Sequence, residues 1–344
     1  MISFFRKIRR GLLTDNKFSR YLVYAAGEIV LVFIGILIAL QVNNRNETRK
    51  KEKTAIEILK QIQTDLVTSV ANADGVLKFY YKIDSLAYLV LSEKVTAHEY
   101  LSNPELVLLI NTNYSFFIKD YGFKKLDQYL EYMPKETELL KRNLYYLYTD
   151  VKHLVEIDND LMANEVDRNN RMLKENKNWF WKFAFSGSLD NEALDYFLTD
   201  PMYKNYVEVY CLLENYNLCF NTMKFRTNAI KIYNEISETI KSDNSADTEI
   251  FPFYLDVDNY KNWTGKYKGN FNGEDYAIEI TIEDGTLFWQ LNNEIKREIF
   301  PFSDTRFYRD GGNAYYSFII NENKDITGLQ LIHWSRYLIC NKIE

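Results

Sequence analysis

The pattern of apolar and polar positions changes twice along the chain. Residues 21–42 are almost continuously apolar, residues 43–241 repeat apolar positions every three or four residues, and residues 253–344 alternate apolar with polar positions. These three patterns are typical of a membrane-spanning helix, of amphipathic helices and of strands, respectively. We therefore predict a membrane-anchored α+β protein with one N-terminal transmembrane helix, a helical-bundle domain and a small C-terminal antiparallel β-barrel or sheet.

The middle region, residues 43–241, is predicted to be a helical bundle. Three glycines lie between Gly35 and Gly265, and few glycines over such a length favour long helices. Prolines stand where helices are expected to start, since the first helical turn tolerates them. The predicted helices cover residues 46–95, 103–118, 123–133, 135–170, 190–198 and 203–241.

The last region, residues 253–344, has the pattern of successive hairpins. Asp284-Gly285 is a tight-turn signal between two stretches in which apolar residues alternate with polar ones. Their apolar residues are Tyr276, Ile278, Ile280, Ile282, Leu287, Trp289 and Leu291. We expect about eight short strands in an up-and-down arrangement. The polar stretch at residues 242–252 is predicted to be a linker.

The apolar run from Tyr21 to Val42 is predicted to cross a membrane and to remain attached. Its 22 residues are enough for a hydrocarbon core of about 30 Å. The run is too long for a signal peptide, and no small-x-small cleavage site follows it. Residues 1–20 carry six basic residues and a short apolar stripe. They are predicted to form a basic amphipathic segment on anionic membrane lipid, with a disordered tail as the alternative.

Basic residues border the span on both sides. Six precede it and five follow it within residues 43–53, so the positive-inside rule favours a cytoplasmic N-terminus by a small margin. We predict a single-pass membrane protein, with its N-terminus in the cytoplasm and its body outside the cytoplasm.

One acidic residue, Glu28, lies inside the predicted span. A charged residue there costs about 2.5–3.5 kcal/mol on insertion scales, so it usually faces protein or water. Either Glu28 is a proton site or a bond to a partner, or it is protonated near the interface and bonded to Tyr24. Gly35, Ala39 and Val42 share its helical face, and small residues allow helices to approach closely. We predict that this face packs against another membrane protein or a second copy of the chain, giving a possible homo-oligomer.

A seven-residue spacing continues beyond the span and predicts a buried stripe. It consists of two rows: Ile56, Gln63, Val70 and Leu77, and Leu59, Leu66, Ala73 and Tyr80. Such a stripe is predicted to pack inside the protein's own bundle in preference to another chain.

Charge and motifs exclude several classes of function. Beyond residue 53 there are 31 basic and 44 acidic residues, so nucleic-acid binding is not expected. The sequence has three histidines and three cysteines and lacks HExxH, GxSxG, P-loop and GxGxxG motifs. No catalytic residue, metal site or cofactor is predicted.

Cys211 and Cys219 are expected on one buried helical face, about 12 Å apart and too far for a disulfide. The acidic positions Glu156, Asp158 and Asp160 are predicted to lie on a solvated helix face.

The most aromatic stretch, residues 178–189, supports two interpretations. Its residues Trp179, Phe180, Trp181 and Phe183 either close one end of the bundle or form an exposed docking patch. Core packing is favoured, and any docking patch is expected here.

Two stretches resemble known families. "FFRKIRR" followed by "YAAGEIVLVFIGILIALQVNNRNE" resembles the N-terminal signature of a family of uncharacterised single-span bacterial membrane proteins, over residues 1–47. That resemblance implies a single-pass protein of the bacterial inner membrane with a cytoplasmic N-terminus, a helical region in the periplasm and no assigned activity. Separately, "WTGKYKG", "IEDGTLFWQL", "FPFSDTRFY" and "ITGLQLIHWS" resemble the small β-domain appended to serine-hydrolase-like proteins. The catalytic half of those proteins has no counterpart in this sequence, so hydrolase activity is not implied.

These features together favour a membrane-anchored, non-enzymatic interaction or scaffold protein, an accessory subunit of a bacterial envelope complex. The alternative is an extracytoplasmic sensor that binds a small ligand. A pilin-like assembly subunit is a minor alternative, since the span has an early glutamate, but Gly27 is followed directly by Glu28 instead of by the expected processing site.

Overall fold

The computed structural model describes residues 18–134, 137–242, 249–251, 257–309, 315–333 and 335–343. The chain forms two compact units. The first comprises Met1–Glu57 and Leu126–Pro134, and the second comprises Ile58–Lys125 and Lys135–Glu344. The predicted basic segment at residues 1–20 lies almost entirely outside the described residues, as does most of the predicted linker at 242–252.

The first unit contains the start of helix α2, Phe18–Leu91. Residues 29–42 of its apolar stretch are exposed, and their large hydrophobic side chains are at least 45 % accessible. Among the described residues this helix alone is long and apolar enough for a membrane span, a property that a signal sequence shares. The 3₁₀ helix η1, Asp127–Tyr132, belongs to the same unit. There the Lys51 ammonium donates to the Tyr132 hydroxyl at 2.6 Å.

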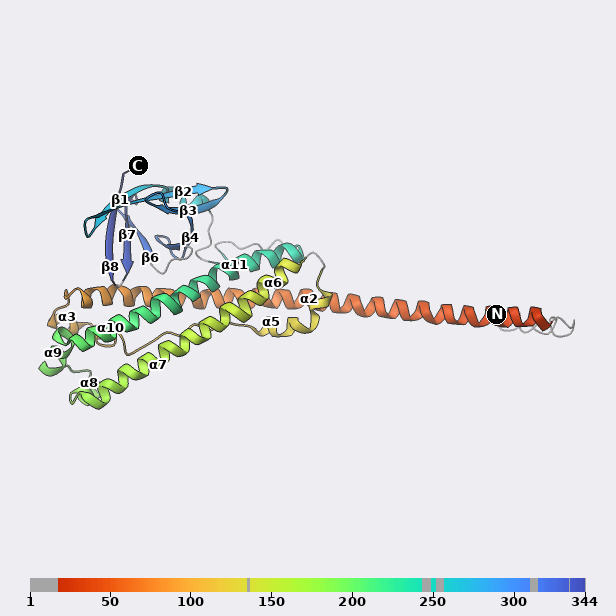
Figure 1. The fold of residues 1–344 in the computed structure, drawn as a ribbon, viewed down its shortest axis with the longest axis horizontal. Helices are drawn as coiled ribbons and strands as arrows, with labels where there is room; N and C mark the ends of the chain where they lie inside the picture. The colour runs from red at the N-terminus through yellow and green to blue at the C-terminus, as the bar shows by residue number, and fades with distance from the viewer. Residues whose placement is uncertain are drawn as a thin grey trace. The chain divides into compact units, whose positions relative to one another are not determined.

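Long helical segments build the helical part of the second unit (Figure 1). One segment is α2 from Ile58 onward. The second contains α6 (Glu138–Tyr145), the π-helical turn η3 (Tyr146–Val151) and α7 (Lys152–Asn176). The third contains α10 (Pro201–Leu213), the π-helical turn η4 (Glu214–Cys219) and α11 (Phe220–Ile240). The predicted rows of α2 are buried from Leu59 to Tyr80, so the stripe packs within its own bundle as predicted.

Short helices connect the long ones. They are α3 (Ala97–Ser102), α4 (Pro104–Val107), α5 (Tyr121–Leu126), α8 (Phe180–Ser186) and α9 (Asn191–Thr199). The predicted helix at 103–118 is wrong beyond Val107, because side chains of other helices bind the backbone that follows. The Asn159 side-chain amide accepts from the Phe116 N–H and donates to the Phe116 carbonyl, both at 2.9 Å. The Ser69 hydroxyl accepts from the Lys119 N–H at 2.9 Å. These bonds replace the helical ones.

Eight antiparallel strands close into a barrel in the order β1 to β8, as the alternating pattern predicted. They follow the 3₁₀ helix η5, Val257–Trp263. The strands are β1 (Gly265–Phe271), β2 (Glu274–Glu283), β3 (Thr286–Leu291), β4 (Arg297–Pro301), β5 (Arg306–Arg309), β6 (Tyr315–Ile320), β7 (Ile326–His333) and β8 (Arg336–Lys342). Tyr267 pairs with Lys342, which joins β1 to β8 and completes the closure. Trp263, Tyr267, Trp289 and Phe307 are among the aromatic residues of the barrel's own core.

Polar and aromatic contacts join the barrel to the helices of the same unit. The Tyr308 hydroxyl on β5 donates to the Met223 carbonyl of α11 at 3.3 Å and lies 2.9 Å from the Thr227 hydroxyl. On β6, Tyr315 meets Tyr81 of α2 edge-to-face, with ring centroids 5.6 Å apart. The last described α-helix ends at Ile240 and the first strand begins at Gly265, and the predicted change from helical to β structure lies between these residues.

Candidate functional site

Two fully buried carboxylic acids meet in the interior of the second unit. Asp84 comes from α2 and Glu214 from η4, and neither side chain is accessible to solvent. The Asn215 side-chain amide bridges them, because its Nδ2 donates to Asp84 Oδ1 at 2.8 Å and to Glu214 Oε2 at 2.9 Å. Within the described part of the chain, neither carboxyl group forms an ion pair with a basic side chain. Two buried acids without a cation are costly to ionise.

Two buried thiols lie beside these acids. Cys211 precedes Glu214 by one helical turn, and the ligand atoms of Asp84, Cys211 and Glu214 all lie within 4.8 Å of one another. The Cys219 thiol donates to Glu214 Oε1 at 3.2 Å. Both cysteines are free and inaccessible to solvent. The cluster of Asp84, Cys211, Glu214, Asn215 and Cys219, hereafter the acid–thiol cluster, therefore combines carboxylate, amide and sulfur atoms.

The local helix geometry explains why these side chains share one face. Cys211, Glu214 and Asn215 are three and four residues apart, which places them on the same side of a helix. Cys219 follows Glu214 by five residues and would be rotated by about 140° from it in an α-helix. The segment Glu214–Cys219 is π-helical, and its wider turn brings residues five apart into line. The π-helical turn is therefore what adds Cys219 to the cluster.

Several polar atoms at the cluster are buried and lack a hydrogen-bond partner among the described residues. They are Asp84 Oδ2, Asn215 Oδ1 and the hydroxyl of Tyr315. Tyr315 belongs to β6 and is inaccessible to solvent. Its hydroxyl interacts with the nearby Cys219 thiol, at a geometry short of a full hydrogen bond. A buried polar group without a partner costs about 1–3 kcal/mol, so three at one place call for a specific explanation.

Burial sets the protonation of the acid–thiol cluster. It raises the pKa of Asp84 to about 8, against the opposing effect of the hydrogen bond from Asn215. Burial also raises the pKa of Glu214, and the neighbouring Asp84 adds to the rise. The pKa values of the Cys211 and Cys219 thiols are raised well above their usual range by burial and by Glu214. With only these groups present, the site holds protons at neutral pH.

The predicted membrane face lies elsewhere, on the exposed part of α2. Glu28 is half-buried, while Gly35, Ala39 and Val42 are exposed. A Cβ atom added to Gly35 would meet no heavy atom within 4 Å. Described residues of this chain therefore leave room beside the Gly35 position for a closely packed neighbour.

The predicted aromatic residues are divided between core and surface. Trp179 is 3 % exposed, with its ring centroid 5.7 Å from those of Tyr196 and Phe197, so it belongs to the core instead of a docking patch. Trp181 is 64 % exposed. Phe180 and Phe183 line a groove of about 700 Å³. Trp179 is thus a core residue, and a docking role for Phe180, Trp181 and Phe183 stays a prediction.

Sequence reasoning missed the acid–thiol cluster, although one signal was available. Asp84 follows Leu77 by seven residues and continues the buried row of α2, where a carboxyl group is unexpected. Likewise, Glu214 follows Val207 and Tyr210, two buried positions of α10, by seven and four residues. An acid in an apolar stripe indicates a buried polar site. The π-helical turn gives no such signal in the sequence.

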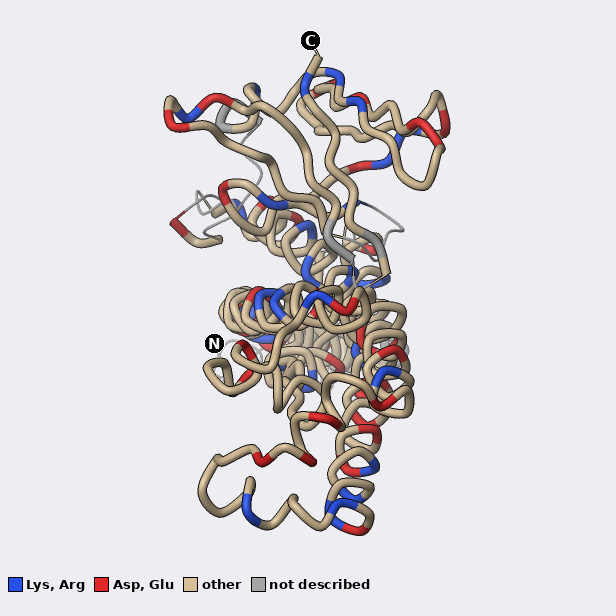
Figure 2. The backbone as a smooth tube through the Cα atoms, turned by 90° about the vertical axis from the view of Figure 1, so that its left-hand side faces the viewer, with Lys and Arg blue, Asp and Glu red and all other residues tan. Residues whose placement is uncertain are grey.

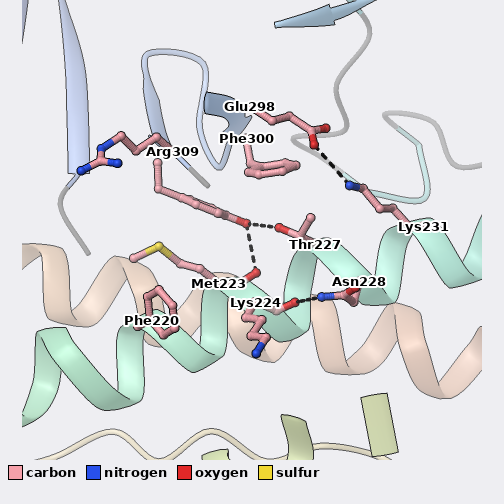
Figure 3. Close-up of a pocket in the computed structure, with 10 residues that line it drawn as sticks. Phe220, Met223, Lys224, Thr227, Asn228, Lys231, Glu298, Phe300 and Arg309 are labelled. Atoms are coloured by element: carbon pink, nitrogen blue, oxygen red, sulfur yellow. Dashed lines mark hydrogen bonds and ion pairs between the residues drawn. The ribbon is translucent and has the colours of Figure 1, made fainter. Parts of the chain in front are cut away.

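A second hollow, of about 230 Å³, lies between α11 and strands β4 and β5. Figure 3 shows Lys224, Asn228 and Lys231 along the helix, opposite Glu298 and Phe300. Lys231 Nζ is 3.2 Å from Glu298 Oε2, so this ammonium is already paired across the crevice. The crevice is open to solvent and smaller than most ligand pockets, which are about 300–1,000 Å³.

Comparison with known proteins gives one family match. A model described as "Family of unknown function (DUF6090)" matches residues 28–123. The match is consistent with resemblance to an uncharacterised family, and it covers residues 28–47 of the predicted signature but not residues 1–27. It includes Asp84 and stops before Glu214 and the barrel. No curated protein and no solved structure gives a significant match, so the resemblance of the barrel to a hydrolase-associated β-domain stays a prediction.

Proposed function

We propose that this chain is a membrane-anchored, non-enzymatic interaction protein, an accessory or scaffold subunit of a bacterial envelope complex. The observation that carries the proposal is the exposed apolar stretch of α2. Among the described residues, nothing buries its most apolar 18-residue window. Soluble monomers rarely expose so much contiguous apolar surface, whereas lipid or a partner helix would cover it.

The face around Glu28 supports a protein partner in addition to lipid. Glu28, Gly35, Ala39 and Val42 share one stripe on α2. Inside hydrocarbon a carboxyl group is stabilised when it faces a hydrogen-bonding partner. Small residues also let the backbone of a second helix approach closely. The partner is another membrane protein or a second copy of this chain. In this proposal the N-terminus is cytoplasmic and the body is periplasmic.

The surface charge of the remaining chain fits a protein partner better than a nucleic acid. Figure 2 shows Asp and Glu interspersed with Lys and Arg along the helices and in the barrel loops. The 44 acidic residues beyond residue 53 outnumber the 31 basic ones, so no excess of positive charge is available to neutralise phosphates.

Co-purification from a mild detergent tests the partner-binding face. Glu28→Gln is expected to retain the partner, because glutamine keeps the hydrogen-bonding reach of a neutral glutamic acid. Glu28→Leu is expected to weaken association by about 0.6–2 kcal/mol. Gly35→Leu should weaken it as well, by blocking close approach. Ala26→Leu is the matched control, since residue 26 lies about 160° away from Glu28 around the helix.

The variants also distinguish partner binding from proton transfer. A proton-transfer role makes Glu28→Gln as damaging as Glu28→Leu, because neither side chain titrates. Unchanged association in all variants would contradict the proposed partner-binding face.

Orientation is tested separately by fusing alkaline phosphatase or green fluorescent protein to Glu344. A fluorescent, phosphatase-negative chain would contradict the periplasmic placement of the body.

One observation favours the second candidate function, a ligand-binding sensor. The groove lined by Phe180 and Phe183 has a volume of about 700 Å³, within the range of small-molecule sites. A small molecule that co-purifies with the chain, and is lost in Phe183→Ala but retained in Phe185→Ala, would support the sensor. Phe185 is the control because it is 88 % exposed and does not line the groove.

A further inference from the structure

We propose that the acid–thiol cluster is a structural zinc site, with Asp84, Cys211, Glu214 and Cys219 as ligands. The inference is independent of the proposed membrane function. It rests on the position of four ligand-bearing side chains in one buried place, and on buried polar atoms at that place that lack partners.

The distances suit a small divalent cation. Zinc binds carboxylate oxygen at about 2.0–2.2 Å and thiolate sulfur at about 2.3 Å, which places ligand atoms of a tetrahedral site about 3.5 Å apart. One ligand atom each of Asp84, Cys211 and Glu214 already lies within 4.8 Å of the others. Cys219 Sγ is 3.2 Å from Glu214 Oε1. Asp84, Cys211 and Glu214 therefore supply three ligands that already lie close together, and Cys219 beside Glu214 is the fourth.

The donor set favours zinc over harder cations. Magnesium and calcium require oxygen ligands, whereas a mixture of thiolates with carboxylates suits zinc. All four side chains are inaccessible to solvent, which is typical of a closed structural site and leaves no position for a substrate. Metal binding would release the protons of two acids and two thiols, and the cation would offset two of the four negative charges in a place without a basic partner among the described residues.

Neighbouring side chains can orient the ligands. Asn215 Nδ2 donates to one oxygen of each carboxyl group, so it can orient both while their other oxygens bind the metal. Asp84 Oδ2 is the oxygen without a partner, which makes it the available ligand atom.

The barrel contributes Tyr315 to the surroundings of the proposed site. The buried Tyr315 hydroxyl lies near Cys219 and lacks a hydrogen-bond partner of its own. Zinc binding converts a thiol to a thiolate, which is an acceptor for such a hydroxyl. Tyr315 also contacts Tyr81 of α2. Zinc would thus tie α2, α10 and η4 together and give β6 a hydrogen-bond acceptor at the junction of the barrel with the helices.

The test uses the full chain, purified in detergent and treated with a chelator. Zinc is added, excess metal is removed by dialysis, and the bound metal is measured by elemental analysis. Cobalt replaces zinc in a parallel sample, because thiolate-to-cobalt charge transfer reports sulfur ligation in the near ultraviolet. We expect one metal per chain, a charge-transfer band with cobalt, and a higher melting temperature when zinc is bound.

Ligand variants locate the metal. Loss of a group that only hydrogen-bonds a metal ligand weakens metal binding by roughly 10–100-fold. Cys211→Ser and the isosteric Asp84→Asn each remove a ligand, so we expect each to weaken zinc binding by more than that. Circular dichroism of the metal-free variants checks that they fold. Cys340→Ser is the matched control, because Cys340 is a buried free cysteine in the core of the barrel, and it should bind zinc like the wild type.

Three results would overturn the proposal. A folded, chelator-treated wild type that takes up neither zinc nor cobalt would show that the two acids are simply protonated and bridged by Asn215. Binding that survives in both Cys211→Ser and Asp84→Asn would place the metal elsewhere. Cobalt binding without a charge-transfer band would remove the cysteines from the site.

Discussion

Arg226 of α11 is a buried cation with one clear partner. Its side chain is 2 % exposed, and its Nε donates to Asp74 Oδ1 at 2.5 Å. One further guanidinium nitrogen, Nη2, is buried without a hydrogen-bond partner among the described residues. The charge is therefore tolerated mainly because Asp74 of α2 neutralises it. Removing one member of a buried ion pair leaves the other uncompensated.

We predict that Asp74→Ala lowers the free energy of unfolding by about 3–5 kcal/mol. The measurement is urea unfolding of the full chain in detergent, followed by circular dichroism. The matched control is Glu105→Ala, which removes the exposed pair of Glu105 with Lys82, whose side chains are 53 % and 58 % exposed. That change should cost about 0–1 kcal/mol. Equal losses in the two variants would contradict the importance of burial.

Asp158 of α7 corrects the prediction of a solvated acidic face. It is 5 % exposed, and its Oδ2 accepts from Asn221 Nδ2 at 2.7 Å. Burial raises the pKa of Asp158, while the hydrogen bond from Asn221 opposes the rise. The charged form is therefore disfavoured in the folded state relative to the unfolded state.

The sign of the resulting pH dependence follows from proton binding. Above about pH 4, the usual pKa of aspartate, the unfolded state loses this proton before the folded state does. Asp158 therefore reduces stability as the pH rises through that point. Asp158→Asn keeps a hydrogen-bonding oxygen but cannot ionise. We predict that the melting temperature of this variant minus that of the wild type is larger at pH 7 than at pH 4. An unchanged difference between the two pH values would contradict a raised pKa.

At the scale of elements, closure of the barrel depends on a close approach of β1 to β8. A Cβ atom added to Gly269 would lie 2.3 Å from the Ile339 carbonyl oxygen and 2.8 Å from Cys340 Sγ. The first contact is with backbone, which cannot move aside like the end of a flexible side chain. Glycine is therefore required by space at this position, since every larger residue carries a Cβ atom.

We predict that Gly269→Ala lowers the free energy of unfolding by about 1–3 kcal/mol, the usual cost of overpacking. The change is measured by unfolding followed through near-ultraviolet circular dichroism of the barrel tryptophans. Lys268→Ala on the same strand is the control, since Lys268 is exposed and surface changes stay within about 0.5 kcal/mol. A neutral Gly269→Ala would mean that β1 and β8 are farther apart than described.

At the scale of the whole molecule, the barrel has a hydrophobic core of its own. Trp263, Tyr267, Trp289 and Phe307 belong to it. Tyr308 also bonds to α11, and Tyr315 contacts α2. A region with a separate core can fold alone, but isolation would remove these outer contacts.

We predict that residues 253–344, expressed alone, give a dispersed amide NMR spectrum and melt below the barrel in the full chain. The lower melting temperature follows from loss of the contacts of Tyr308 and Tyr315 with the helices. A collapsed spectrum would contradict independent folding, while equal melting temperatures would show that those contacts contribute little.

The sequence by itself determined the type and order of the main elements. The apolar run, the buried rows from Leu59 to Tyr80 and the alternation around Asp284-Gly285 each record the environment of neighbouring positions. Helical and strand periods are local properties, so they are readable without any knowledge of distant contacts. The long apolar helix at the start of α2 and about eight antiparallel strands, in a barrel or a sheet, were predicted on this basis.

Only the tertiary structure decided which distant residues meet. Asp84 and Asn215 are 131 positions apart, and they come together because α2 packs against α10 and η4 in one particular register. The π-helical turn η4 brings Cys219 beside Glu214, and the side chains of Asn159 and Ser69 hold residues near Phe116 and Lys119 out of a helix. Each outcome depends on hydrogen bonds and burial between segments far apart in the chain. A local pattern cannot encode such contacts, because the energy that selects them exists only after the helices have packed.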